Sequence, residues 1–255
     1  MNDGFDPLSY FDVTQLSLLS PSFNEKKVLL VKNNNKLIEY SLDTKQGKTI
    51  FQDKKISSIA KNRLSKNYYV IEKAASNKDP DSISILDEHF TRIKHVPVKN
   101  GLKQSLFSED GESIAYICEK STMVYIQSMI NGDRNEINTN SHFIQLHDWQ
   151  DQLLLISTFD SRLENTLGLL NIEDGTIHWL PLPTGYYHTA YFYEHDTILF
   201  TSNAYGEFLS LYTYNYKLNT RKNLFKAHYD IENTQLDKDN RQIIFTLNKN
   251  GGTTL

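Results

Sequence analysis

The histidines have the widest chemical repertoire of the residues in this sequence, and six of the eight lie in its second half. A metal site needs three or four donors at one point. These six follow one another at spacings of 5, 31, 10, 7 and 33 residues, which match no ligand motif. We therefore predict no metal site and no cofactor, and we place the histidines in turns and at strand ends. They are His142, His147, His178, His188, His195 and His228.

Aromatic and charged residues in two short stretches are the candidates for binding a ligand. Tyr186, Tyr187 and His188 come at the entry to a predicted strand, and alternate side chains there could contact a peptide. Arg162 and Glu164 lie in a predicted loop, where binding residues often occur. Both stretches could bind a peptide. The alternative for the aromatic rings is packing between sheets, and the alternative for the charged residues is a solvated loop.

Nucleophilic catalysis finds little support in these residues. The sequence contains no Gly-x-Ser-x-Gly, the strained turn that presents a serine to its base and oxyanion hole. The single cysteine, Cys118, ends an apolar run and is predicted to be a buried structural thiol. We expect no catalytic residue in this chain.

The elements that must position these residues are short strands that repeat along the chain. The segment 107–117, FSEDGESIAYI, joins a polar turn to an apolar strand, which is a signal for strand, turn and strand. Equivalent strands recur at separations of 40, 46, 39, 45 and 45 residues, and each follows a comparable turn, such as that expected at Asp148 to Asp151. The aligned residues are Leu29, Tyr69, Ala115, Leu154, Leu199 and Ile244.

Each repeat contains four short apolar runs separated by turns, such as Asn131-Gly132 and Asp174-Gly175. Four-stranded antiparallel units of about 40 to 45 residues are the blades of a β-propeller. A sandwich would not require the same four-strand pattern six times. We predict an all-β single domain over 1–255, a β-propeller with five complete blades and part of a sixth. The expected blades are 14–52, 55–98, 101–139, 142–182, 187–227 and 230–255.

Composition excludes several classes of function. The net charge is -4, and Lys and Arg are scattered without a basic stripe, so we expect no nucleic-acid partner. No apolar window approaches the length needed to cross a bilayer, and the acidic start carries no export signal, so we expect a cytoplasmic protein without a membrane partner. The last residues, Thr253 to Leu255, begin the next strand of the sixth repeat. We therefore expect an N-terminal fragment of a longer chain.

The opening of the chain resembles the propeller of prolyl oligopeptidase family serine peptidases, of the acylaminoacyl-peptidase and dipeptidyl-peptidase types. The resemblance is carried by YFDV at 10–13, LSLLSP at 16–21, KVLLV at 27–31, LIEYSLDT at 37–44 and FSEDGESIAYI at 107–117. It covers nearly the whole chain as a repeat pattern, and TolB-type propellers share these turns.

The resemblance implies a cytosolic peptidase in which this propeller binds or gates peptide substrate for an α/β-hydrolase domain absent from this chain. Dipeptidyl-type members also hold the substrate amino terminus with an adjacent Glu pair, and this sequence has none. The alternative is a TolB-like propeller that acts as a protein-interaction scaffold with no enzymatic activity.

Overall fold

The computed structural model describes residues 16–21, 26–52, 55–62, 66–74, 80–99, 101–141, 143–161, 163–237 and 242–254. These residues form strands and turns, and none of them belongs to a helix that could span a bilayer. The chain divides into two compact units, 1–102 and 103–255, each considered by itself below.

The first unit contains two antiparallel sheets of four strands each, with the strands side by side in chain order. The buried side chains of β2, β3, β5, β6 and β7 form one apolar cluster between the two sheets. The first sheet comprises β1 (Leu16–Pro21), β2 (Lys27–Lys32), β3 (Lys36–Ser41) and β4 (Gln46–Gln52), and the second β5 (Lys55–Asn62), β6 (Asn67–Lys73), β7 (Ser82–Leu86) and β8 (Arg92–Pro97).

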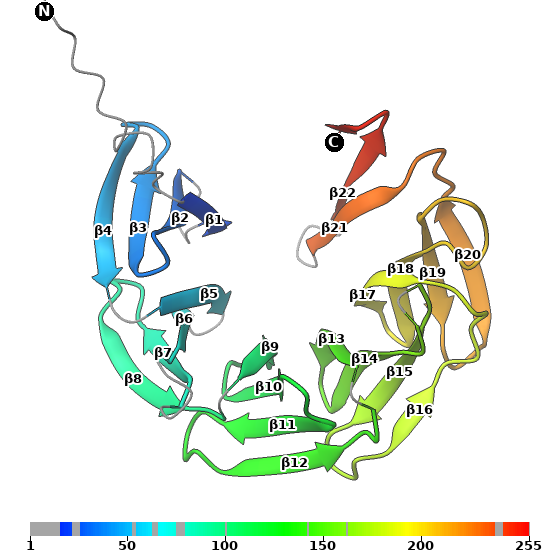
Figure 1. Cartoon of the computed structure of the whole chain (residues 1–255), viewed down its shortest axis with the longest axis horizontal. Helices are drawn as coiled ribbons and strands as arrows, with labels where there is room; N and C mark the ends of the chain where they lie inside the picture. The colour runs from blue at the N-terminus through cyan, green and yellow to red at the C-terminus, as the bar shows by residue number, and fades with distance from the viewer. Residues whose placement is uncertain are drawn as a thin grey trace, which may run out of the picture. The chain divides into compact units, whose positions relative to one another are not determined.

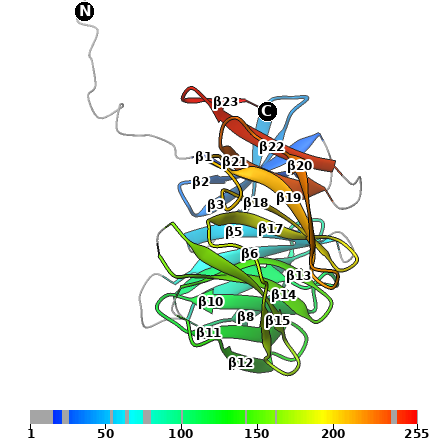
Figure 2. The ribbon, with the colours of Figure 1, turned by 90° about the vertical axis from the view of Figure 1, so that its right-hand side faces the viewer.

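The second unit contains four antiparallel sheets, the third to sixth of the chain, and in each the strands again follow chain order. The first strands of these sheets follow one another as neighbours (Figures 1 and 2). The third sheet comprises β9 (Leu102–Phe107), β10 (Ser113–Cys118), β11 (Met123–Ser128) and β12 (Arg134–Asn138); the fourth β13 (Ile144–Gln150), β14 (Leu153–Phe159), β15 (Asn165–Asn171) and β16 (Ile177–Trp179); the fifth β17 (Tyr187–Glu194), β18 (Thr197–Ser202), β19 (Ser210–Asn215) and β20 (Thr220–Phe225); and the sixth β21 (Ile231–Asp237), β22 (Gln242–Lys249) and β23 (Gly252–Thr254).

The predicted fold class is confirmed, because five four-stranded antiparallel blades and a three-stranded sixth follow one another along the chain. The six residues aligned in the sequence all lie in the second strand of their sheets. Leu29, Ala115, Leu154 and Leu199 are 0% exposed. A second strand whose two faces are both covered by adjacent sheets is a nearly continuous apolar run, whereas Ile244 in the last sheet is 46% exposed.

The turns between strands use residues that tolerate a left-handed backbone. Asn33, Asn219 and Asp196 have φ angles of 51°, 53° and 59° in the described turns. Gly111 reaches 74° in the predicted turn of the third repeat. Next to it, Asp110 accepts from the Ser108 hydroxyl at 2.6 Å and from Glu112 N at 2.8 Å, and these hydrogen bonds lower the pKa of the carboxyl.

The turn expected at Asp148 to Asp151 is shorter than predicted. Strand β13 continues to Gln150, with a bulge between Leu146 and Asp148. The reason is Trp149, which is 7% exposed in the core and whose indole nitrogen donates to Asp151 O at 2.8 Å. Burial of this ring outweighs the turn preference of the aspartates beside it.

Three side chains on first strands each bind the backbone of the following sheet in the second unit. Gln104 Oε1 accepts from Leu146 N at 2.9 Å, and Gln104 Nε2 donates to Leu146 O. Asp148 Oδ2 accepts from Phe192 N at 2.9 Å, and Tyr191 Oη donates to Thr234 O at 2.6 Å. These partners are 42, 44 and 43 residues apart. We call these three interactions the forward clamps.

Candidate functional site

The predicted ligand-binding residues lie in or next to the fourth and fifth sheets of the chain, both in the second unit. Glu164 is in the loop between β14 and β15, as predicted, and Tyr187 begins β17. Tyr186 precedes that strand and His188 is its second residue. Arg162 lies outside the described residues. Glu164 and Tyr187 line one small cavity. Tyr186 and His188 do not line it, and their rings contact each other.

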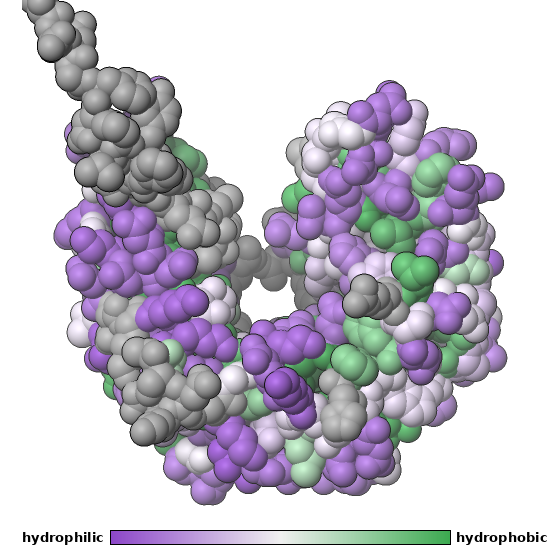
Figure 3. All heavy atoms as spheres, in the orientation of Figure 1, coloured by the Kyte–Doolittle hydropathy of each residue, from purple (hydrophilic) through white to green (hydrophobic). Residues whose placement is uncertain are grey.

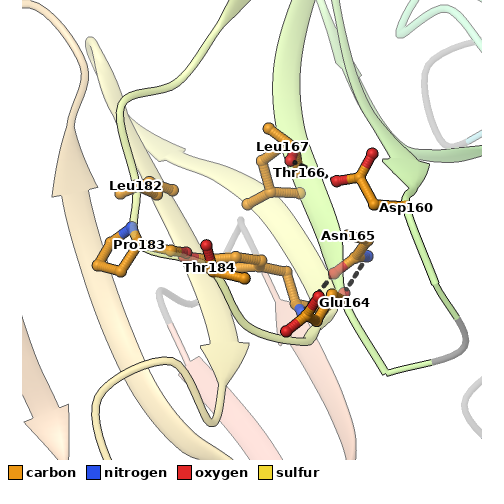
Figure 4. Close-up of a pocket in the computed structure, with 9 residues that line it drawn as sticks. Asp160, Glu164, Asn165, Thr166, Leu167, Leu182, Pro183 and Thr184 are labelled. Carbon is orange, nitrogen blue, oxygen red and sulfur yellow. Dashed lines mark hydrogen bonds between the residues drawn. The ribbon is translucent and has the colours of Figure 1, made fainter.

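The small cavity has a volume of about 60 Å³, enough for a few water molecules rather than for a peptide side chain. Figure 4 shows the residues that surround it, with Glu164 and Asn165 on one side and Pro183 and Thr184 on the other. The remaining lining residues are Asp160, Thr166, Leu167, Leu182 and Tyr187.

Tyr187 is anchored rather than presented to solvent. Its side chain is 1% exposed, and its hydroxyl donates to Pro183 O at 2.5 Å. Burial, followed by the neighbouring Tyr205, raises the pKa of the phenol far above its ordinary value. The ring also packs against Phe200, with centroids 5.4 Å apart. Tyr187 therefore fixes the start of β17 and positions the residues on either side of it.

Asn165 holds this strand from the neighbouring sheet. Its side chain is buried, Nδ2 donates to Tyr187 O at 2.9 Å, and Oδ1 accepts from Tyr187 N at 2.7 Å (Figure 4). The amide thus replaces the backbone of a neighbouring strand. Sequence reasoning missed Asn165, although a polar residue at the start of an apolar strand was a usable signal.

An aromatic recess lies beside the small cavity. Phe143, Phe159, Asp160 and Ser161 line a hollow of about 690 Å³. Phe143 is 65% exposed, and the ring of Phe159 lies 6.4 Å from that of Tyr186. We define the aromatic recess as Phe143, Phe159, Asp160, Ser161 and the adjoining ring of Tyr186. Sequence reasoning found Tyr186 but missed the two phenylalanines, which end or precede strands and read as ordinary core residues.

Two histidines, His147 on β13 and His188 on β17, lie near each other. The ring of His188 lies 5.8 Å from that of Tyr186 at a tilt of 36°, and a positive charge on His188 would disfavour one on His147. His147 Nε2 lies 2.9 Å from Ser157 Oγ. Burial, and then His188, lower the pKa of His147 to about 4, and burial lowers the pKa of His188. Both rings are therefore neutral near pH 7.

The chemistry of this region suits binding more than catalysis. His188 Nδ1 is buried without a hydrogen-bond partner among the described residues. Asp160 lines both the aromatic recess and the small cavity, and Glu164 lines the small cavity, so each adds a negative charge there. Among the described residues, no group of three or more His, Cys, Asp or Glu side chains could hold a metal ion.

Comparisons with known proteins identify the fold. No family model and no curated protein sequence matches this chain. Among solved structures, the acylaminoacyl peptidase of Pyrococcus horikoshii matches with a TM-score of 0.64 and 14% identity over 91% of this chain and 41% of that one. The chain therefore spans less than half the length of that peptidase.

Two further solved structures have the same fold. The β-propeller domain of the trilobed protease from Pyrococcus furiosus matches with a TM-score of 0.63 and 15% identity, over 91% of this chain and 74% of that one. TolB from Acinetobacter baumannii matches with a TM-score of 0.61 and 13% identity, over 92% and 57%. The resemblance found in the sequence is thus confirmed for the fold: the chain is similar to the propellers of these peptidases and to TolB.

Proposed function

We propose that this chain is the non-catalytic propeller portion of a prolyl oligopeptidase family serine peptidase. In this proposal it binds or gates peptide substrate for an α/β-hydrolase domain carried elsewhere in the protein. The aromatic recess is the observation that carries it, because the exposed ring of Phe143 and the partly exposed rings of Phe159 and Tyr186, beside the carboxylate of Asp160 and the imidazole of His188, suit the apolar and polar groups of a peptide. The similarity of the fold to peptidase propellers supports the same assignment.

The proposed peptide site has a division of roles. Tyr186 and His188 contact the peptide, Glu164 contributes charge at the rim, and Tyr187 positions the strand that carries the first two. Arg162, which the sequence places in the same loop as Glu164, contributes the opposite charge in this proposal.

Peptide binding is tested on the purified chain with fluorescein-labelled tetrapeptides that contain one Phe or Leu, by fluorescence polarisation. We expect saturable binding and a loss of about tenfold or more in Tyr186→Ala, which removes an aromatic contact. Tyr229→Ala is the matched control, because Tyr229 is a partly exposed tyrosine that packs on Phe208 at the end of the fifth sheet. Equal affinities of the two variants, or no saturable binding, would contradict the proposal.

The absence of catalysis is tested separately with aminoacyl and prolyl ester substrates. We expect no turnover, because the sequence lacks the nucleophile elbow. Turnover that persists when a serine-directed phosphonate inhibits contaminating hydrolases would show a catalytic centre in this chain and refute this part of the proposal.

The similarity to TolB supports a second candidate, a TolB-like propeller that serves as a protein-interaction scaffold. The two candidates differ in what the gene encodes. Reading the frame beyond Leu255 discriminates them, because the peptidase proposal requires Gly-x-Ser-x-Gly followed by Asp and then His. A reading frame without this series would favour the protein-interaction scaffold over the peptidase.

A further inference from the structure

The rings of Phe143 and Phe159 are neighbours on one face of the fourth sheet. β13 pairs with β14 up to Ile144 and Thr158, so Phe143 and Phe159 come next, opposite each other, at the open end of the hairpin. Phe159 N donates to Phe143 O at 3.1 Å there. Directly opposite residues of antiparallel strands direct their side chains to the same face. The aromatic recess therefore has a wall of two paired rings.

The rings of the aromatic recess are accessible to a ligand. Phe143 is 65% exposed, and Phe159 and Tyr186 are partly exposed. The hollow of about 690 Å³ lies within the size range of ligand pockets and exceeds the volume of one side chain. Figure 3 shows hydrophobic residues at the surface of the second unit, in the area where Figure 1 places β14 and β18. A group of large apolar side chains at the surface commonly marks a contact site.

Asp160 places a carboxylate beside these rings. It follows Phe159 directly, its side chain is exposed, and its backbone N donates to Glu164 O at 3.1 Å. Thr166 Oγ1 donates to Asp160 Oδ2 at 3.3 Å (Figure 4). Asp160 Oδ1 has no hydrogen-bond partner among the described residues. The carboxylate is thus held on one oxygen and leaves the other for a ligand.

The described groups around the aromatic recess favour a positive charge. The charged side chains that line the recess hollow and the small cavity are Asp160 and Glu164, and none of the described lining residues is Lys or Arg. His147 and His188 add no charge near pH 7, because burial lowers the pKa of each ring. The faces of the aromatic rings are themselves negative. A cationic ligand group is therefore complementary to this part of the site.

The classes of peptide side chain differ in their effect on Asp160. An acidic side chain would be repelled by the carboxylate. An aliphatic side chain would cover the carboxylate and remove water from it without supplying a hydrogen bond, which is unfavourable. A lysine or arginine side chain supplies a donor to Oδ1, packs its methylene groups on the rings and is attracted by their faces.

We propose that the aromatic recess selects peptides by a positively charged side chain, that of lysine or arginine. The cationic head bonds Asp160 Oδ1, and the methylene groups pack on Phe143 and Phe159. This inference rests on the proposed function, because it names the class of peptide that the same site takes.

The test compares four fluorescein-labelled tetrapeptides on the purified chain by fluorescence polarisation. Each peptide has an amidated carboxyl end and one Phe, and the residue beside that Phe is Lys, Arg, norleucine or Glu. We expect the Lys and Arg peptides to bind about tenfold more tightly than the norleucine peptide, and the Glu peptide to bind more weakly than norleucine. Higher salt concentrations should reduce these differences, because salt screens exposed charges.

Variants of the chain locate the preference. Asp160→Asn removes the charge but keeps an oxygen for Thr166, so the Lys and norleucine peptides should bind it with similar affinity. Asp151→Asn is the matched control, because Asp151 is an exposed aspartate in the turn at the other end of the same hairpin. Phe143→Leu keeps an apolar side chain without a ring, and it should weaken binding of the Lys peptide several-fold more than that of the norleucine peptide.

One further variant controls for the positive charge that the sequence places two residues after Asp160. In Arg162→Gln the preference for Lys should persist. Equal binding of the Lys and norleucine peptides to the parental chain would overturn this inference and leave the proposed function intact, whereas no saturable binding of any peptide would contradict both. An unchanged preference for Lys in Asp160→Asn, or its loss in Arg162→Gln, would also overturn the inference.

Discussion

The side chain of Asn165 binds the backbone of Tyr187 through both amide atoms, at 2.9 Å to the carbonyl oxygen and 2.7 Å to the nitrogen. It joins the third strand of the fourth sheet to the first strand of the fifth. Because Tyr186 and His188 flank Tyr187, this interaction also sets the position of the candidate peptide site.

Asn165→Asp should destabilise the protein, because a carboxylate oxygen replaces the Nδ2 donor opposite Tyr187 O. The expected loss is about 1–3 kcal/mol in the free energy of unfolding, the cost of an unsatisfied buried group. Urea denaturation measures it. Asn223→Asp makes the same change on the exposed strand β20 and should have little effect. Equal losses in the two variants would mean that Asn165 contributes no specific interaction.

Gly185→Ala should disturb the start of the candidate site. A Cβ there would lie 2.5 Å from Ala204 Cβ and 2.7 Å from Ala204 Cα, and Gly185 O accepts from Asn165 N. The backbone must shift, at a cost of about 1–3 kcal/mol. Gly206→Ala is the control, because its Cβ would meet no atom within 4 Å. Thermal unfolding and NMR shifts of Tyr186 compare them, and unchanged shifts in Gly185→Ala would contradict the expectation.

The free energy of unfolding should decrease as the pH falls, because His147 has a lowered pKa in the folded protein. The pKa of its half-buried ring is about 4, against an ordinary 6.5, so the unfolded chain binds the proton first as the pH falls. The contribution of the neutral His147 ring to the free energy of unfolding is complete above pH 6.5. It is lost between pH 6.5 and 4, by up to about 3 kcal/mol. The lowered pKa of His188 acts in the same direction.

His147→Gln should flatten this part of the pH profile, because glutamine does not titrate. Urea unfolding at a series of pH values measures the difference between variant and parent. His178→Gln changes an exposed histidine and should keep the parental slope. A parental slope in His147→Gln would show that the acid sensitivity has another origin.

Gln104→Ala should weaken the first of the forward clamps. It leaves Leu146 N and O without the side chain that binds both, at an expected cost of about 1–3 kcal/mol. Faster hydrogen exchange at the Leu146 amide is the specific readout. Gln235→Ala, on an exposed position of β21, should change neither quantity. Unchanged exchange at Leu146 would refute the clamp.

The repeated strands could be predicted because their physical cause is local. A second strand buried on both faces must be apolar along its length, and the turn before it needs residues such as Asp, Asn and Gly. Both requirements leave a signal within ten residues of sequence, as at Ser108 to Ile117. The turn expected at Asp148 to Asp151 is shorter than predicted because its cause is not local: the burial of Trp149 depends on a neighbouring sheet, which local composition does not reveal.

The candidate site was less visible because it depends on residues far apart in the chain. Tyr186 and His188 are adjacent in a run of aromatic residues, so the sequence predicts them as a binding site. Phe143 and Phe159 lie near Tyr186 only once the strands of the fourth and fifth sheets have assembled. Asn165 reaches Tyr187 across 22 residues, and no spacing rule singles it out. The sequence predicts His147 in a turn or at a strand end, whereas it lies within β13 near His188, which only the three-dimensional structure reveals.

The forward clamps have a consequence for how such a protein can change in length over evolution. Each reaches the next sheet after 42 to 44 residues, so duplicating or losing one whole sheet changes the number of clamps and leaves the remaining ones in register. Adding half a sheet would misalign every clamp that crosses the insertion. Relatives with more or fewer sheets should therefore differ by whole repeats.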